Sequence, residues 1–169
     1  MNRSIVCVLA CLLAMISTAS AQQTDKPAKA EPSQEELEKQ FAETMSGATL
    51  VGHFTITGLT DDKPPKEERY TLGKVAKLEN GLWLFEARIQ YLEHDVKLPL
   101  ALPVKWAGDT PVITVTDVAF PGLGTYTARV IVYRGQYSGT WSGGTHGGHL
   151  FGRIVKEAEA KPAADGSRK

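Results

Sequence analysis

Apolar and polar residues alternate along most of the chain after residue 49, with a repeat of two positions. A strand points successive side chains to opposite faces of its sheet, so this repeat indicates strands with one apolar face. Four runs alternate clearly, at 49–57, 83–91, 96–106 and, less cleanly, 126–132. Four weaker runs lie at 68–78, 111–118, 136–142 and 148–156. The pattern predicts about eight strands around a single core.

Turn-forming residues separate these runs. Asn80-Gly81 is the strongest hairpin signal, because both residue types tolerate positive φ and apolar runs flank them. The other connections are too short to hold crossover helices, which argues against a parallel sheet. The sequence therefore predicts a mainly β fold, an up-and-down antiparallel barrel or sandwich of about eight strands.

Two prolines, Pro99 and Pro103, lie four positions apart in the run 96–106. Their missing N–H groups point to the same side of a strand, and that side cannot form a complete hydrogen-bond ladder. We expect the segment 95–105 to be an edge strand or to border a gap in the barrel. The prolines would then flank a groove or protect an edge from aggregation.

One helix is predicted before the strands, at 33–46. Ser33 and Glu36 have the spacing of a capping box, and Gly47 is a typical C-terminal stop. Apolar side chains recur every fourth residue at Leu37, Phe41 and Met45. This narrow apolar stripe predicts that the helix lies against the β domain as a plug or lid.

The N-terminus has the layout of a secretory signal peptide at 1–21. Arg3 precedes an apolar run that is too short for a membrane span, and small residues end the segment. We favour cleavage over a membrane anchor or lipid attachment at Cys11, which predicts a secreted or periplasmic chain beginning at Gln22. A flexible linker at 22–32, one β domain at 33–156 and a disordered tail at 157–169 complete the organisation.

Composition excludes several classes of function. The chain has 19 basic and 19 acidic residues, and only Arg3 falls within 1–21, so a cleaved chain carries one net negative charge. A basic surface for nucleic acid is not indicated, and no later run is apolar enough to span a membrane. The only cysteines, Cys7 and Cys11, lie in the predicted signal, which rules out disulfides and thiolate chemistry in the mature chain. No cofactor motif is present.

The segment 137–152 is rich in glycine and aromatic residues. The simplest interpretation is a tight terminal hairpin, in which Gly139 and Gly152 make room for Trp141 and Phe151. Alternatively, a loop at 143–148 presents two histidines, His146 and His149, to a metal ion, with His53 or His94 as a third ligand. Zinc sites usually show three or four identifiable ligands, and strand residues three apart face opposite ways.

Candidate ligand-binding residues come from two places. Tyr137 and Trp141 are large aromatic side chains of the glycine-rich segment. Glu86 and Arg88 share one face of the run 83–91, where they form either a surface charge pair or polar groups in a cavity. No Gly-x-Ser-x-Gly motif or other nucleophile arrangement supports an enzyme.

The order of a helix, about eight up-and-down strands and the final hairpin YSGTWSGGTHGGHLFG resembles small secreted bacterial β-barrels of calycin-like form. The resemblance implies a small apolar ligand inside the barrel, and it carries over no site residues.

The leading hypothesis is an exported, non-enzymatic binding protein for a small apolar or amphipathic ligand or a cell-envelope component. One alternative is a metal site or metal-dependent enzyme at His146 and His149. Another is a structural or protein-interaction domain that docks through the proline-bearing strand.

Overall fold

The computed structural model describes residues 31–57 and 64–156. The predicted signal peptide at 1–21, nearly all of the linker at 22–32 and the tail at 157–169 lie outside these residues. Within the described ranges, no helix is both long and apolar enough to cross a membrane.

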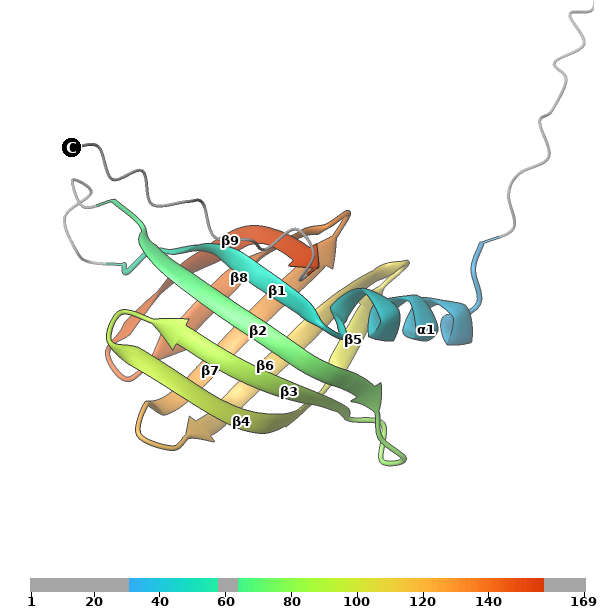
Figure 1. Ribbon diagram of the computed structural model, residues 1–169, viewed down its shortest axis with the longest axis horizontal. Coiled ribbons are helices and arrows are strands. Elements are labelled where there is room, and N and C mark those ends of the chain that lie inside the picture. Colours follow the sequence, from blue (N-terminus) through green and yellow to red (C-terminus); the bar gives the residue numbers. More distant parts are fainter. Residues whose placement is uncertain (1–30, 58–63, 157–169) are drawn as a thin grey trace, which may run out of the picture. The chain divides into compact units, whose positions relative to one another are not determined.

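One helix and nine antiparallel strands make up the described part of the chain (Figure 1). In chain order they are α1 Gln34–Met45, β1 Ala48–Phe54, β2 Lys66–Lys77, β3 Trp83–Tyr91, β4 His94–Leu102, β5 Val104–Ala107, β6 Thr110–Phe120, β7 Gly124–Tyr133, β8 Gln136–Gly143 and β9 His146–Lys156. The mainly β prediction is confirmed, and so is the helix, within one residue at each end.

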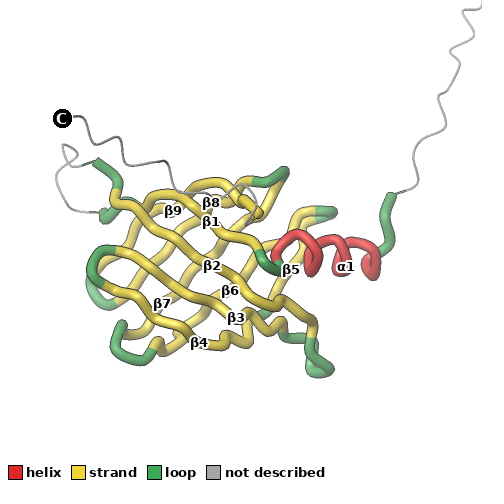
Figure 2. Tube along the Cα trace, in the orientation of Figure 1, coloured by secondary structure: helices red, strands yellow, loops and turns green. Residues whose placement is uncertain are grey.

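The nine strands form a single sheet that curls on itself (Figure 2). Its order is β4-β3-β2-β1-β9-β8-β7-β6-β5, so consecutive strands pair except at β4–β5, and β1 also pairs with β9. The two end strands, β4 and β5, follow each other in the chain with only Pro103 between them. The Thr114 N–H donates to the Pro103 carbonyl at 2.9 Å. The two ends of the sheet therefore meet within one chain segment, as a barrel requires.

Pro103 explains why nine strands are present where about eight were expected. It divides the predicted strand 96–106 into β4, which pairs with β3, and β5, which pairs with β6. β4 lies near β6 but does not pair with it. The sheet is therefore open along β4, as the prolines predicted, because Pro99 and Pro103 have no N–H to donate across that edge.

The inner face of the curled sheet is apolar and its outer face is polar. In β3 the inward residues Trp83, Phe85 and Ile89 are buried, and the polar residues between them point outward. The same alternation holds in β1 and β4. One apolar core therefore lines the inside of the barrel.

Helix α1 packs over one end of the barrel, where β1 begins. The Phe41 ring meets the Trp83 and Trp106 rings edge to face, with centroids 4.9 and 6.0 Å apart. Met45, one turn later, is fully buried. The predicted capping box is present, with Ser33 and Glu36 joined by bonds of 3.2 and 3.3 Å. The helix thus lies against the domain, as its narrow apolar stripe predicted.

Polar contacts fasten the C-terminal end of α1 to the sheet. The Ser46 hydroxyl bonds both the N–H and the carbonyl of Val75, at 3.0 and 3.2 Å. The Lys156 ammonium donates to the carbonyls of Glu43 and Ser46, at 2.8 and 2.7 Å. The two bonds from Lys156 satisfy carbonyls that the end of a helix leaves without partners.

Candidate ligand cavity

A cavity of about 230 Å³ lies inside the barrel. Side chains from α1 and from every strand except β5 line it, and nearly all of them are aliphatic or aromatic. Within the described part of the chain, Glu68 is the one carboxylic acid among the lining residues, which include no lysine, arginine or histidine. The interior is therefore an apolar chamber with a single acidic group.

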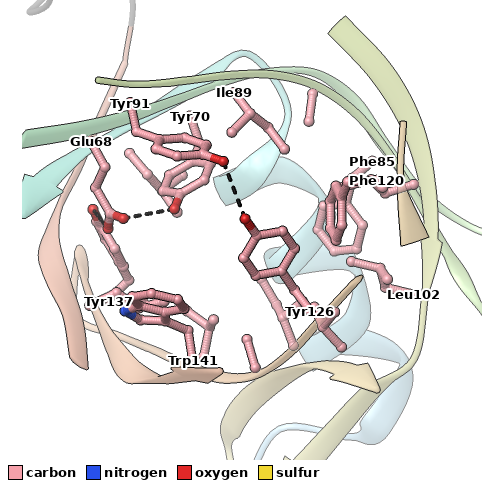
Figure 3. Close-up of a pocket in the computed structure, with 18 of the residues that line it drawn as sticks. Glu68, Tyr70, Phe85, Ile89, Tyr91, Leu102, Phe120, Tyr126, Tyr137 and Trp141 are labelled. Atoms are coloured by element: carbon pink, nitrogen blue, oxygen red, sulfur yellow. Dashed lines mark hydrogen bonds between the residues drawn. The ribbon is translucent and has the colours of Figure 1, made fainter. Parts of the chain in front are cut away.

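Two tyrosines hold the Glu68 carboxylate. The Tyr70 hydroxyl donates to Oε2 at 2.7 Å, and the Tyr137 hydroxyl donates to Oε1 at 2.9 Å. Figure 3 shows the Glu68 and Tyr70 side chains joined inside the barrel. Glu68 and Tyr137 are almost wholly buried. A buried acid is tolerated when hydrogen bonds replace its lost water, and here two tyrosines provide them.

Two glycines let Tyr137 reach Glu68 across the sheet. Glu68, Gly52, Gly152 and Tyr137 lie in one register row that crosses β2, β1, β9 and β8. A Cβ on Gly152 would lie 2.7 Å from Cε1 of the tyrosine ring, and one on Gly52 would overlap its hydroxyl. The tyrosine therefore lies over a strip of bare backbone, which positions its hydroxyl on the carboxylate.

Burial raises the pKa of Glu68 to about 7, although the hydrogen bonds from Tyr70 and Tyr137 act in the opposite direction. Burial also raises the pKa of Tyr70 and of Tyr137 above the ordinary range, and the neighbouring Glu68 adds to this effect. Both tyrosines thus stay protonated and keep donating, while Glu68 changes its charge near neutral pH.

Aromatic side chains surround the part of the cavity farther from α1. Phe54 meets Tyr91 and Trp141 edge to face, with centroids 6.0 and 5.9 Å apart. The Tyr91 and Tyr126 hydroxyls point toward each other across the cavity, 3.4 Å apart (Figure 3). The Tyr126 hydroxyl also bonds the Leu123 carbonyl, at 2.9 Å. This part of the cavity therefore combines ring faces with polar tips.

The structure places two of the candidate ligand-binding residues in this cavity. Tyr137 and Trp141 both line it, and the Trp141 indole N–H donates to the Thr55 carbonyl at 3.1 Å. The segment 137–152 forms the terminal hairpin β8–β9. Two details of that prediction are wrong. Gly139 makes room for the backbone of β7 at Arg129, not for Trp141. Gly152 makes room for Tyr137, because Phe151 points to the outer face and is 42% exposed.

Glu86 and Arg88 lie on the outer face of β3 and do not line the cavity. Arg88 forms an exposed salt bridge with Asp95, at 2.5 Å. Glu86 accepts a bond from the Lys74 N–H at 3.2 Å. The surface interpretation of this face therefore holds, because the alternate positions Phe85, Ala87 and Ile89 take the inner face.

The predicted metal ligands do not come together. His146 and His149 are both exposed and belong to β9, three positions apart. The His146 ring contacts only the neighbouring Thr145 hydroxyl, at 3.2 Å, among the hydrogen bonds of the described chain. No group of three or more His, Cys, Asp or Glu side chains within 31–57 and 64–156 is placed to hold a metal ion.

Sequence reasoning missed Glu68. It lies in the weaker run 68–78, where the charged residues that precede Tyr70 obscure the alternation. A usable signal was present, because Glu68, Tyr70 and Leu72 are spaced by two and so share a face. A carboxylate in line with an aromatic and an aliphatic residue indicates an inward-facing acid once the face is known.

Comparison with known proteins adds no family to this description, since no protein-family model, no curated protein sequence and no solved structure matches the chain.

Proposed function

We propose that this protein is a non-enzymatic binding protein that holds a small apolar molecule inside the barrel. The single observation that carries the proposal is the apolar cavity, to whose wall the described residues contribute one carboxylic acid and no basic group. Binding sites for small molecules are typically apolar hollows with a few polar groups that orient the ligand. With the predicted signal at 1–21, the protein would act outside the cytoplasm, as a calycin-like carrier would.

The size of the cavity limits the ligand. An apolar cavity of about 150 Å³ in an engineered protein binds benzene. The present cavity, at about 230 Å³, has room for one aromatic ring with a short substituent, or for an aliphatic chain of similar bulk. Ethylbenzene is therefore a suitable neutral probe.

The test is titration of the purified protein with ethylbenzene, followed by calorimetry or by native mass spectrometry. Ala128 lines the cavity, so Ala128→Phe places a ring in the space and should abolish binding. Ala101 is exposed on the outer face of β4, so Ala101→Phe is the matched control and should bind as the unmodified protein does. Equal affinity of the two variants, or no binding by the unmodified protein, would refute the proposal.

A further inference from the structure

The cavity contains an acid without a base. Among residues 31–57 and 64–156, no lysine, arginine or histidine lines it together with Glu68, and none of them contributes to the pKa of that residue. When Glu68 ionises, its hydrogen bonds come from two neutral hydroxyl groups, which do not balance the charge. The site thus lacks a positive partner for the carboxylate.

We propose that the cavity selects a small apolar amine, and that the ammonium group of the ligand pairs with the Glu68 carboxylate. This inference rests on the proposed function, because it names the chemical class of the ligand that the same cavity takes.

The tyrosines leave the carboxylate able to accept more. A carboxylate has about four acceptor positions on its two oxygens, and Tyr70 and Tyr137 occupy one on each oxygen. An ammonium group carries three N–H donors, which suits the remaining positions. Because both tyrosines hold the carboxylate in place, little conformational entropy is lost when the ligand binds.

The surrounding rings favour the same chemistry. Tyr70 and Tyr137 line the cavity beside Glu68, and their rings meet edge to face with centroids 6.5 Å apart. Trp141 also lines the cavity, farther along the same strand as Tyr137. The face of an aromatic ring attracts a cation, and the attraction strengthens when water is excluded. An apolar carboxylic acid would instead be repelled by Glu68, and a neutral hydrocarbon would gain nothing from it. An apolar alcohol could donate one bond and should bind with intermediate affinity.

The experiment compares benzylamine, benzyl alcohol and ethylbenzene, which have the same number of heavy atoms, by calorimetric titration at about pH 8, where Glu68 is ionised. We expect benzylamine to bind about tenfold or more tightly than ethylbenzene, since a charge-assisted contact in a dry site contributes at least that factor. Glu68→Gln should remove the preference, so that benzylamine no longer binds more tightly than ethylbenzene. Glu86→Gln, on the outer face, is the matched control and should keep the preference for benzylamine.

A second measurement does not depend on the variant. At about pH 5.5 Glu68 is protonated in the unmodified protein, so the preference for benzylamine should shrink by about tenfold while ethylbenzene binding stays constant. Ethylbenzene binding without any preference for the amine would overturn this inference and leave the proposed function standing. Failure of all three probes would overturn both.

Discussion

The two ends of the barrel interior are built differently. Beneath α1, the rings of Phe41, Trp83 and Trp106 pack edge to face, and none of them lends a polar atom to the cavity. Farther from α1, the inward-facing residues include Glu68 and two tyrosines whose hydroxyl groups donate to its carboxylate. Both regions belong to the core, yet only the second presents hydrogen-bonding groups to the cavity.

The comparison teaches that burial serves stability and recognition in different ways. A closely packed aromatic cluster gains free energy from the area it removes from water, and it gains most when no polar group is trapped. A buried acid costs free energy and is kept only where hydrogen bonds satisfy it. The region around α1 therefore stabilises the fold, and the region around Glu68 gives up some stability for a polar contact point.

The largest expected effect is at the α1 end. Phe41→Ala leaves a hole between the helix and Trp83, so the free energy of unfolding should fall by about 3–5 kcal/mol, measured by urea denaturation. Gln40 is exposed on the same helix, and Gln40→Ala should change stability by less than about 0.5 kcal/mol. Similar losses in both variants would show that α1 does not seal the core.

The second prediction concerns pH. The folded protein keeps a proton on Glu68 up to a pKa of about 7, whereas the unfolded chain releases it near 4.5. The contribution of Glu68 to the free energy of unfolding should therefore be complete below about pH 4.5. About 3 kcal/mol of that contribution should be lost as the pH rises through 7. Denaturation at several pH values, compared between the unmodified protein and Glu68→Gln, measures the difference that this one group makes.

Other acids do not mimic this signal. The pKa of Glu38 is lowered by its bond with Lys77, and that of Asp95 by its bond with Arg88. A carboxylic acid with a lowered pKa loses its contribution to the free energy of unfolding only as the pH falls below the ordinary pKa of such an acid. That loss lies on the acid side of the pH range in which Glu68 titrates. If Glu68→Gln keeps the same slope between about pH 5 and 8, Glu68 is not the buried acid that we describe.

The third prediction tests the glycine strip. Gly152→Ala puts a methyl group against the Val51 carbonyl and the Gly52 backbone of β1 as well as the Tyr137 ring, so both the strand and the ring must shift relative to Glu68. Overpacking of this kind should cost about 1–3 kcal/mol, and the pH dependence should change with it. Gly73→Ala is the control, because its Cβ meets the exposed Glu86 side chain, which can move aside. An equal effect at both glycines would argue against the row from Glu68 to Tyr137.

The smallest effect is expected on the outer face. Glu86→Gln and Arg88→Ala should leave the denaturation midpoint and ethylbenzene binding unchanged, because both side chains face solvent on β3 and water screens the exposed pair that Arg88 forms with Asp95. A clear loss of ligand affinity in either variant would mean that the outer face takes part in binding.

Much of the fold follows from local patterns. The alternation in 83–91 divided the residues of β3 between two faces without deciding which face is buried, and the prolines marked the open edge of the sheet. The strand count differed because Pro103 interrupts a run whose alternation continues across it. A period-two pattern reports the direction of side chains and does not register a switch of pairing partner from β3 to β6.

The site was predicted only in part. Tyr137 and Trp141 stood out as large aromatic residues among glycines, and the structure places both in the cavity. Glu86 and Glu68 are the same residue type on neighbouring strands, and the sequence drew attention to the one that faces solvent. The charged residues next to Glu68 obscure the alternation of apolar and polar positions there. The alternation in 83–91 is clean, so Glu86 was easier to identify as a candidate.

The sequence by itself determined the helix, the mainly β fold and the alternation of side chains between two faces of each strand, because these depend on neighbours within a few positions. Which face is buried was left to the tertiary structure. Only the tertiary structure decided that Glu68 meets Tyr137. These residues are 69 positions apart, and they meet because four strands align Gly52 and Gly152 between them. Register across a sheet depends on all the strands packing together, and no local pattern contains it.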